Sequence, residues 1–378
     1  MKKIGIITFH NSYNCGSMLQ SYAMQKVLKN LSKLDVEIID FSNEGQKELY
    51  GVWYKNSSLK NIIKNICILP IHKRIRNNNF MYEKFKNSFF NLSRKYKNIS
   101  ELSDDDYDFV VAGSDQIWNI TIPDYDDAYF LPWVHKAKKI AYAPSFGSKN
   151  IMEYSSEPSK YAKYIGNFDA LSIRENNGKK WIKDLTNLDV PVLFDPTLLL
   201  PACEYDKLVS DSLNINCEYI FFYSPSFNPK ICKLVNKISK KFNLKVYTWS
   251  SKSYSTKIFS THNFLLPQYE NPSSYLYLIK NAKLVITTSF HGTIFSTIYR
   301  KNFFVIKNGS MFGKDDRVIT LLTQLHMLER LIPMEYVEEF DYLSKIDYTE
   351  YSNIIEKGKK ECFNYLKAII GDPDEKRK

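Results

Sequence analysis

The chain has 378 residues, which is enough for about two to three domains and for a large buried core without disulfide bonds. Hydrophobic residues make up 44% of it and charged residues 25%, so intrinsic disorder is excluded as its main state. The 52 Lys and Arg residues outnumber the 41 Asp and Glu residues and give a formal net charge of +11, which favours an anionic partner such as a phosphorylated small molecule, a nucleic acid or an acidic membrane surface.

Short apolar runs that end in polar or glycine-containing turns alternate with helical patterns through the first half of the chain. Strands are expected at residues 3–9, 36–41, 108–112, 139–143, 170–173 and 192–194, and a helix at 17–31. Because buried strands that alternate with helices are typical of parallel sheets, this half predicts a Rossmann-like domain. The N-terminus resembles a signal peptide only superficially, since its apolar stretch is short, so we expect a first strand and a cytoplasmic protein.

A second series of the same kind follows an irregular polar stretch at 201–216, which we interpret as a linker. Strands are expected at 219–223, 245–249, 284–288 and 303–306, and helices at 230–242, 272–282, 293–300 and 318–328. The expected fold is therefore α/β, with two Rossmann-like domains facing a cleft. Their predicted extents are residues 1–205 and 206–345, followed by a C-terminal helix and a charged tail at 346–378.

Residues 50–103 fit neither half and are predicted to form a helical insertion in the first domain. The stretch contains the basic run HKRIR at 72–76 and aromatic residues at helical spacing from Phe80 to Phe90. One interpretation is an amphipathic segment that contacts anionic lipid headgroups or a lipid diphosphate. The interpretation that we prefer is a helical excursion with its Phe face on the core, because charge runs are usually solvated faces.

Several common kinds of functional site find no support in the sequence. The six cysteines are far apart and form no C-x-x-C pair, which disfavours a zinc ribbon, an iron–sulfur site and a disulfide framework. Neither G-x-G-x-x-G nor G-x-x-x-x-G-K-[ST] occurs, which disfavours nicotinamide enzymes and P-loop phosphotransferases. There is no H-E-x-x-H and the six histidines are dispersed, so no metal is expected. No apolar run approaches the roughly 18 residues of a membrane span.

Unusual polar clusters follow the ends of the predicted strands. In open parallel sheets, ligands bind beyond the carboxyl ends of the strands, so these clusters predict a polar cleft. They are Asn11/Asn14/Gly16, Ser114/Asp115/Gln116, Ser145, Arg174/Glu175, Ser224 and Ser289/His291.

The most informative cluster is TTSFHGT at residues 287–293, where a buried strand turns directly into a helix. The first N–H groups of a helix lack intrahelical partners and favour an anion, and Gly292 lets that anion approach the backbone. His291, at the same place, can donate to a phosphate or move a proton near neutral pH. The structural alternative is an N-cap Ser289 with a histidine packed between phenylalanines.

Arginines near other strand ends are further candidates for anion binding. Arg174 follows the strand at 170–173 and can clamp a carboxylate or phosphate through two parallel hydrogen bonds. The alternative is a salt bridge to Glu175 or to the other domain. Arg317 and Lys307 are weaker candidates of the same kind.

The loop GSDQIWN at 113–119 combines a carboxylate, two amides and an indole. Such a set is typical of a sugar site, in which Asp115 binds hydroxyls while Trp118 stacks on the ring. The alternative is a tight turn with an Asp N-cap and a core Trp.

Six short motifs in order along residues 4 to about 330 make the sequence resemble the polysaccharide pyruvyl transferase family. The motifs are NCGSMLQSYA (14–23), GSDQIWN (113–119), AYAPSFG (141–147), SIRE (172–175), DPT (195–197) and SFHG (289–292). Cys15 departs from the family pattern, in which a small residue is more usual. The segment at 50–103 and the last forty-odd residues match only loosely.

This resemblance implies a fold similar to the two-domain (GT-B type) glycosyltransferases. It also implies a transferase that moves a pyruvyl group from phosphoenolpyruvate to two hydroxyls of one sugar in a bacterial surface-polysaccharide precursor (exopolysaccharide or capsule), forming a cyclic ketal and releasing phosphate. Phosphoenolpyruvate would be a co-substrate, and no cofactor or metal is required.

The expected site residues follow from the motifs together with the strand-end pattern. Catalytic roles are expected for His291, Arg174 and Asp115. In the second domain, the donor anion is expected to bind Ser289, Gly292, Thr293, Lys307 and Arg317. In the first domain, the acceptor is expected to bind Asn11, Asn14, Gly16, Gln20, Gln116, Trp118, Asn119 and Ser145.

A nucleotide-sugar-dependent glycosyltransferase remains an alternative, because the same fold presents a helix N-terminus to a diphosphate. A carbohydrate-binding or scaffold module is a non-enzymatic alternative. The expected partners are phosphoenolpyruvate and a glycan acceptor, which a lipid can carry, with peripheral contact to the inner membrane surface as an option. No nucleic acid is expected, because no recognised binding motif accompanies the positive charge.

Overall fold

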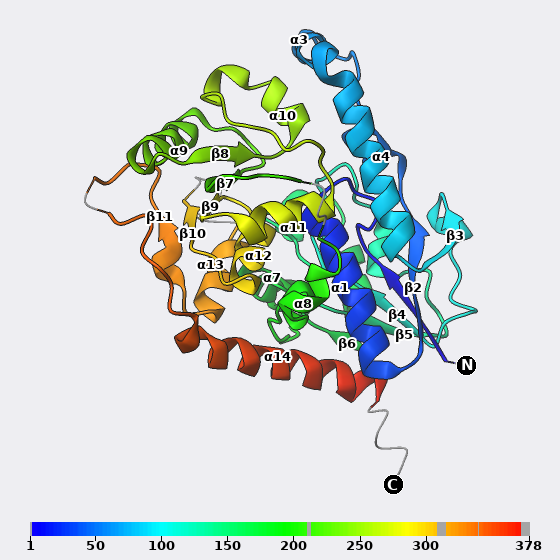
Figure 1. Ribbon diagram of the computed structural model, residues 1–378. Coiled ribbons are helices and arrows are strands. Elements are labelled where there is room, and N and C mark those ends of the chain that lie inside the picture. Colours follow the sequence, from blue (N-terminus) through cyan, green and yellow to red (C-terminus); the bar gives the residue numbers. More distant parts are fainter. Residues whose placement is uncertain (1, 210–212, 308–314, 339, 372–378) are drawn as a thin grey trace.

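Buried apolar runs form the strands of two separate parallel β-sheets in the computed structural model of the chain (Figure 1). The structure describes residues 2–209, 213–307, 315–338 and 340–371. In the first sheet, β3 (Leu92–Tyr96), β2 (Asp35–Phe41), β1 (Lys3–Ile7), β4 (Phe109–Ala112), β5 (Lys138–Ala141) and β6 (Ala170–Leu171) lie in that order. In the second, the order is β11 (Leu331–Ile332), β10 (Phe303–Ile306), β9 (Leu284–Thr287), β7 (Tyr219–Tyr223) and β8 (Lys245–Thr248).

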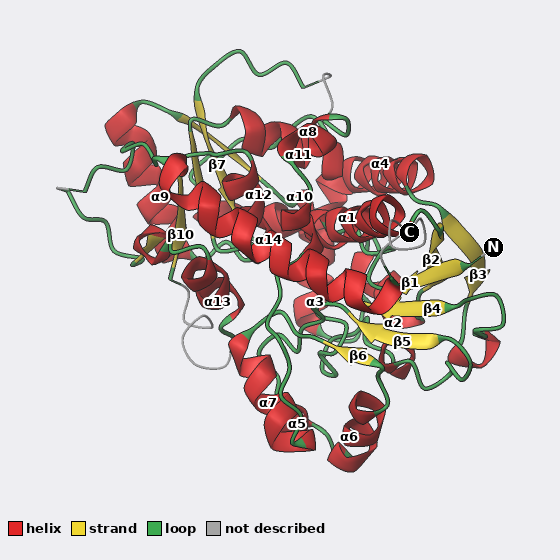
Figure 2. Ribbon diagram, turned by 90° about the horizontal axis from the view of Figure 1, so that it is seen from below, coloured by secondary structure: helices red, strands yellow, loops and turns green. Residues whose placement is uncertain are grey.

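Helices connect the strands and cover both sheets, as a view from below shows (Figure 2). Those associated with the first sheet are α1 (Cys15–Ser32), α2 (Glu44–Tyr50), α3 (Leu59–Ile68), α4 (His72–Phe89), α5 (Ile151–Tyr154), α6 (Pro158–Gly166) and α7 (Asn176–Thr186). The remaining ones are α8 (Ala202–Asp206), α9 (Pro229–Phe242), α10 (Ser251–Ser255), α11 (Pro272–Asn281), α12 (Phe290–Ile298), α13 (Arg317–Gln324) and α14 (Tyr348–Ile370). The architecture is α/β with two Rossmann-like domains, as the sequence predicts. The domain boundaries at 205 and 345 stay predictions.

Local sequence explains where the two helices that face the other domain begin. The Asn14 side chain accepts hydrogen bonds from the Gly16 and Ser17 backbone N–H groups and caps α1. Asn271 caps α11 through a capping box with Ser274, and Pro272 occupies the first turn. Such caps satisfy N–H groups that have no partner within the helix.

One hydrophobic core is shared by the two sheets, and each sheet has a second core on its other face. The shared core contains the apolar faces of α1, α11 and α12, and α1 contacts α11 directly. Trp118 and Phe130 lie in the core on the far face of the first sheet, and Phe222 lies in that of the second. The shared core fixes the two sheets relative to one another.

Two helices cross from one sheet to the other. The C-terminal helix α14 runs along the lower edge in Figure 1. At one end, its Tyr348 hydroxyl donates to the Lys301 carbonyl oxygen beside the second sheet (2.7 Å), and near the other its Tyr365 hydroxyl donates to the Ala141 carbonyl oxygen of the first (3.1 Å). At the opposite edge of the molecule, Arg74 Nε on α4 donates to Ser251 Oγ on α10 (2.7 Å).

The structure corrects three of the expectations on secondary structure. Residues 92–96, inside the expected helical insertion, form β3 at the edge of the first sheet. The expected strand at 192–194 is reduced to one bridge, between Val192 and Ile173. Part of the expected linker forms α8, whose Tyr205 is fully buried. The other predicted elements agree within a few residues; α12 begins three residues earlier than expected.

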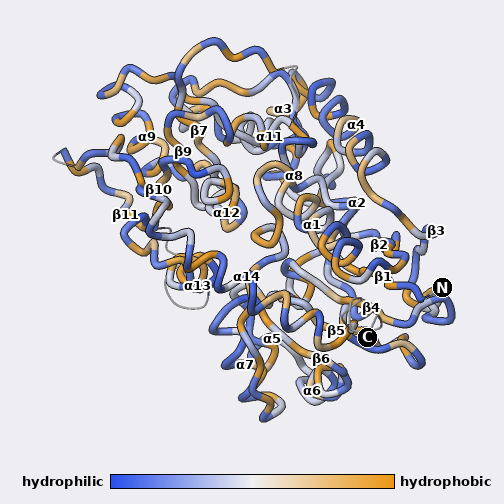
Figure 3. The backbone as a smooth tube through the Cα atoms, turned by 60° about the horizontal axis from the view of Figure 1, so that its bottom comes forward, coloured by the Kyte–Doolittle hydropathy of each residue, from blue (hydrophilic) through white to orange (hydrophobic). Residues whose placement is uncertain are grey.

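The preferred interpretation of the insertion is right for α4 only. Tyr82 and Phe85 on α4 belong to the shared core, whereas α3 buries only Ile68. Figure 3 shows both hydrophobic and hydrophilic residues along α3 and α4. The predicted tail beyond Gly371 lies outside the described residues, as does the middle of the expected linker, residues 210–212.

Candidate active site

The candidate site lies where the strand order of each sheet reverses. In the first sheet the reversal is between β1 and β4, and in the second it is between β7 and β9. Loops that leave neighbouring strands in opposite directions at such a point open a crevice beyond the carboxyl ends of the strands, which is where ligands bind in this class of sheet. Here the two crevices face each other.

A pocket of about 270 Å³ occupies this position. Its first-sheet wall comes from the loops after β1 and β4, and its second-sheet wall from the segments after β7, β9 and β10. The lining residues are Asn14, Ser17, Asp115, Gln116, Tyr223, Pro225, Ser226, Thr288, Ser289, Phe290, His291, Asp315, Arg317 and Val318. The structure thus brings together six of the expected site residues: His291, Asp115, Ser289, Arg317, Asn14 and Gln116.

The N-terminus of α12 points His291 into this pocket. Ser289 is the N-cap, and its hydroxyl accepts a hydrogen bond from the Gly292 N–H at 3.3 Å. A β-carbon at Gly292 would lie 2.5 Å from Thr287 Oγ1, so glycine is needed for the sharp turn from β9 into the helix. The partial positive charge of this helix end makes the pocket suitable for an anion.

The N-terminus of α1 lies against His291. A β-carbon at Gly16 would come within 2.2 Å of His291 Nδ1, which means that only glycine leaves room for the imidazole. The expected acceptor residue Gly16 therefore contacts the histidine and does not line the pocket.

Asp195 is a buried carboxylate that joins the two domains behind the pocket. It receives a hydrogen bond from Arg174 Nη1 (2.8 Å), lies 3.4 Å from His291 Nε2, and also accepts from Ser114 and Thr197. Burial alone would raise the pKa of Asp195, but the charges of His291 and Arg174 together with these hydrogen bonds hold its pKa well below the usual range. Asp195 is therefore a fixed negative charge next to His291.

Arg174 lies behind the pocket and not on its wall. Its guanidinium stacks on the Phe290 ring, 4.3 Å from the centroid, and Phe290 lines the pocket. Its Nη2 is 3.7 Å from Asp115 Oδ1, too far for a hydrogen bond. In the described structure the expected direct clamp of an anion by Arg174 is thus replaced by contacts to Asp195 and Phe290.

Three buried donors around Asp195 lack hydrogen-bond partners among the described residues. They are Nε and Nη2 of Arg174 and Nε2 of His291, whose approach to Asp195 is not aligned for a hydrogen bond. Buried polar groups are nearly always paired, because leaving one unpaired costs about 1–3 kcal/mol. These atoms surround Asp195 behind the pocket, so the negative charge of Asp195 is their nearest compensation.

Arg317 is the guanidinium on the pocket wall. Its Nε and Nη2 bind the two carboxylate oxygens of Asp315 at 2.8 and 2.7 Å. Burial lowers the pKa of Arg317, but the Asp315 contact outweighs burial and raises it, and the same pair lowers the pKa of Asp315. The pair fixes the orientation of the Arg317 guanidinium at the first turn of α13.

Asp115 faces the pocket from the first sheet. One of its oxygens accepts from Ser17 Oγ (2.6 Å) and the other from the Gln116 N–H (2.8 Å). Nearby, Glu175 is fully buried, and burial raises its pKa to about 7 in spite of Arg174 and Arg317. The site therefore combines an ionised, hydrogen-bonded Asp195 with a buried acid that holds its proton near neutral pH.

The remaining expected site residues do not line the pocket. Trp118 is a correction: it is fully buried, stacks on Phe130 and donates to the Tyr129 carbonyl, so it cannot stack on a sugar. Gln20 is fully buried beneath the Ser114 turn. The others that do not line the pocket are Asn11, Gly16, Gly292, Thr293, Lys307, Asn119 and Ser145.

Asp195, Asp315 and Tyr223 belong to the site but were not among the expected residues. The DPT motif carried a signal for Asp195, because it follows a predicted strand end as the other clusters do. Asp315 and Tyr223 carry no comparable signal, since pairing with Arg317 and contact with the facing domain depend on the tertiary structure.

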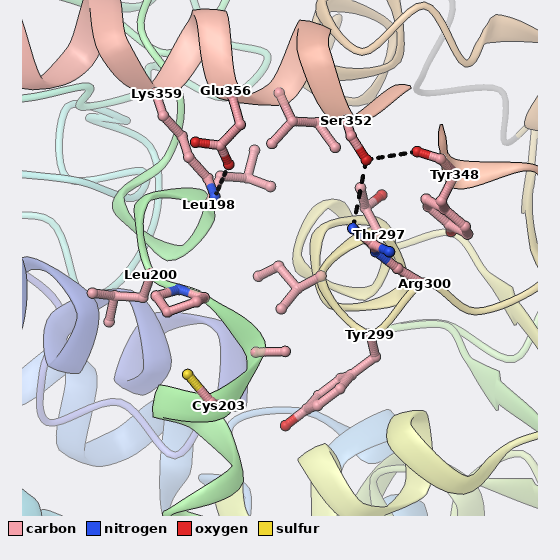
Figure 4. Close-up of a pocket in the computed structure, with 14 residues that line it drawn as sticks. Leu198, Leu200, Cys203, Thr297, Tyr299, Arg300, Tyr348, Ser352, Glu356 and Lys359 are labelled. Atoms are coloured by element: carbon pink, nitrogen blue, oxygen red, sulfur yellow. Dashed lines mark hydrogen bonds and ion pairs between the residues drawn. The ribbon is translucent and has the colours of Figure 1, made fainter. Parts of the chain in front are cut away.

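A second pocket, of about 570 Å³, lies between α8, the C-terminal end of α12 and α14 (Figure 4). Apolar groups dominate its wall, Lys359 is paired with Glu356, and Arg300 donates to Ser352 Oγ at 3.5 Å. It contains the C-terminal end of α12, which carries partial negative charge, and is therefore a poorer place for an anion.

Comparisons with known proteins bear on the family and the fold of the chain. The sequence model of the polysaccharide pyruvyl transferase family matches residues 14–310. No curated protein matches the sequence. Solved structures that resemble the chain include S. aureus MnaA in complex with UDP (11% identity, 98% of this chain and 97% of that chain covered, TM-score 0.50). Another is the UDP-GlcNAc 2-epimerase from Neisseria meningitidis bound to UDP-GlcNAc (11% identity, 98% and 94% covered, TM-score 0.47). At this identity the likeness shows the fold alone, which is of the GT-B type.

Proposed function

Because the chain belongs to the polysaccharide pyruvyl transferase family, we propose that it moves a pyruvyl group from phosphoenolpyruvate to two hydroxyls of one sugar, forming a cyclic ketal and releasing phosphate. Family membership makes the protein a transferase with a glycan acceptor. The donor and the ketal chemistry are the proposal, and the observation that carries it is that His291, the N-terminus of α12 and Arg317 line one pocket.

The reaction adds one proton to the methylene carbon of phosphoenolpyruvate and removes one proton from each of two acceptor hydroxyls. Protonation of the methylene carbon of phosphoenolpyruvate gives an oxocarbenium-like centre at C2, which the first hydroxyl attacks. The second hydroxyl forms the second C–O bond at C2 as the C2–O bond to phosphate breaks. The methylene becomes a methyl group, each hydroxyl loses its proton, and inorganic phosphate leaves.

The pocket supplies groups suited to each of these steps. The N–H groups at the start of α12 and the Arg317 guanidinium attract the phosphate and carboxylate of the donor. His291, next to the fixed charge of Asp195, is suited to donate a proton to the donor. Asp115, on the facing wall, is suited to accept a proton from an acceptor hydroxyl. Arg174 is a positioning residue, which holds Asp195 and Phe290 in place.

The size of the pocket also favours a small donor. A volume of about 270 Å³ is at the small end of the range for ligand pockets and suits a three-carbon phosphorylated acid better than a nucleotide sugar. The acceptor would approach from the first-sheet wall, where Asn14, Ser17 and Gln116 offer hydroxyl-binding groups. No cofactor or metal is required by these steps.

Donor dependence tests the proposal. The purified protein is incubated with phosphoenolpyruvate and a panel of bacterial glycans, and phosphate release and a mass gain of one pyruvylidene group are measured. Labelled nucleotide sugars serve as the competing donors. We expect product with phosphoenolpyruvate only, strongly reduced product for His291→Ala, and full activity for His135→Ala, whose side chain is exposed.

Calorimetry with phosphoenolpyruvate alone removes the dependence on the right acceptor. We expect heat of binding for the unaltered protein and a clear weakening for Arg317→Met. Sugar transfer from a nucleotide donor, or no binding of phosphoenolpyruvate with or without glycan, would refute the proposal.

A further inference from the structure

Helix α3 is amphipathic in the reverse sense to an ordinary surface helix. Its large apolar residues Leu59, Ile62, Ile63 and Ile66 follow the i, i+3, i+4, i+7 spacing of one helix face, and every one of them is exposed. Leu59 is 74% exposed and Ile66 59%. A helix of a globular domain normally turns this face toward the core.

The polar face of α3 packs on the loop that precedes the helix. Asn65 donates to the Tyr54 carbonyl and accepts from the Tyr54 N–H, both at 2.9 Å. Asn61 donates to the Lys55 carbonyl, also at 2.9 Å. These bonds tie the loop before α3 to the helix and hold the apolar face outward. The loop therefore covers the polar face of α3 and leaves the apolar face open to solvent.

The second domain carries further exposed apolar residues. Helix α10 packs against α3, and both lie at the upper edge of the molecule in Figure 1. The Lys252 Nζ on α10 lies over the Tyr54 ring, 4.3 Å from its centroid. The short 3-10 turn η5 (Ile258–Ser260) follows α10, and it carries an Ile258 that is 52% exposed and a Phe259 that is fully exposed.

Charge decides which partner fits this surface. Residues 51–82 contain six Lys and Arg and no Asp or Glu, and residues 250–269 contain two Lys and again no acidic residue. A second copy of the chain would bring two such basic segments together. An anionic bilayer complements them, because each basic side chain near its surface is attracted to the headgroups while the apolar face of the helix enters the interface.

We propose that α3 with its Lys60 and Lys64, together with η5, forms a docking surface for an anionic membrane. The protein would lie on this membrane without crossing the bilayer. No helix in the described part of the chain is long and apolar enough to span one. The surface includes residues of both domains, so docking would hold the whole molecule in one orientation. This inference does not depend on the proposed reaction.

Vesicle binding by the full-length protein tests the surface. Flotation with phosphatidylglycerol-containing vesicles is compared with flotation on pure phosphatidylcholine vesicles, at low and at physiological salt. We expect binding to the anionic vesicles that weakens with salt. The variants Ile63→Asp/Ile66→Asp and Lys60→Glu should each lower the partition coefficient by more than about tenfold.

Matched variants elsewhere control for general effects of charge. Leu328→Asp and Lys360→Glu change exposed residues on the 3-10 turn η7 (Leu328–Arg330) and on α14, and both should bind vesicles like the unaltered protein. Because Ile63, Ile66 and Lys60 are exposed, the variants should unfold at the same temperature as the parent. Phe259→Asp tests the second-domain part of the surface independently and should weaken binding as well.

A site-specific probe distinguishes docking through α3 from general adsorption. Cys67 on α3 and Cys203 on α8 are both exposed. An environment-sensitive fluorophore on Cys67, in a Cys203→Ser/Cys217→Ser background, should shift to the blue on anionic vesicles, whereas one on Cys203, in a Cys67→Ser/Cys217→Ser background, should not.

Equal binding of parent and Ile63→Asp/Ile66→Asp, or no binding to anionic vesicles, would overturn the proposal. Light scattering that shows self-association through this face, abolished by the same substitutions, would reassign the surface to a second copy of the chain.

Discussion

Gly16 and His291 touch across the boundary between the two domains, although 275 positions separate them in the sequence. The start of α1 and the start of α12 meet here, and a β-carbon at position 16 would be 2.2 Å from His291 Nδ1. The missing side chain at Gly16 thus allows the two helix N-termini to approach one pocket.

Gly16→Ala should displace His291 without unfolding the protein. An added methyl group forces the imidazole or α1 to move, and a displacement of about 1 Å in a catalytic group can reduce turnover by roughly 10²-fold. The measurement is kcat for phosphate release from phosphoenolpyruvate. Gly166→Ala, where a β-carbon meets nothing within 4 Å, is the control and should leave kcat unchanged. Full activity of Gly16→Ala would show that the position of His291 is unimportant.

Arg317→Lys should raise the KM for phosphoenolpyruvate by about tenfold and change kcat less. A lysine cannot reproduce the paired hydrogen bonds that orient the guanidinium on Asp315, and it offers no planar fork to a phosphate or carboxylate. Steady-state kinetics with varied donor measure this effect. Arg330→Lys, at a surface pair with Glu329, is the matched change and should leave both constants unaltered.

Glu175→Gln should make stability less sensitive to pH. The pKa of Glu175 is raised to about 7 by burial, so the folded state holds this proton more tightly than the unfolded chain does. Its contribution to stability is complete below the unfolded pKa, near 4.3, and is lost as pH rises to about 7, which corresponds to roughly 3 kcal/mol.

Urea unfolding at pH 5 and pH 8 measures this effect. At pH 5 the free energy of unfolding of the variant should be equal to that of the parent or lower. At pH 8 it should be higher than that of the parent. Glu361→Gln, at an exposed position on α14, should show the same difference from the parent at both values. A pH-independent effect of Glu175→Gln would mean that Glu175 is ionised in the folded protein.

Trp118→Ala should destabilise the fold by about 3–5 kcal/mol, because it removes a fully buried ring that stacks on Phe130. Thermal or urea unfolding measures this loss. Trp53→Ala, at a position that is 39% exposed, should cost far less. If Trp118→Ala instead kept the stability of the parent and raised only the KM for the acceptor, Trp118 would be a residue that stacks on the acceptor sugar.

The sequence predicts the parallel sheets and the place of the site because both depend on local patterns. Buried apolar runs identify β1, β4, β7 and β9, and polar or small residues directly after them identify the crevice. The motif around His291 contains a strand end, an N-cap and a helix start within seven residues, so the sequence locates the turn, although α12 begins three residues earlier than expected.

Contacts between distant segments explain what the sequence does not predict. Arg174 follows a strand as expected, but its side chain is held by Asp195 and covered by Phe290 from the other domain. The residues next to Trp118 in the sequence are typical of a sugar site. Only its contacts with Phe130 and Tyr129 in the structure show that Trp118 faces the core. For α3, periodicity gives an apolar face but not its direction, which depends on the bonds of Asn61 and Asn65.

The crossings of α4 and α14 limit how the halves of this molecule can separate. Two lobes joined at a single hinge swing apart freely, whereas here a bond from Arg74 to Ser251 at one edge and the bonds of Tyr348 and Tyr365 at the other would have to break first. Together with the shared hydrophobic core, these contacts oppose separation of the two lobes, so we expect substrate entry and product release to depend on side chains and loops at the rim of the pocket.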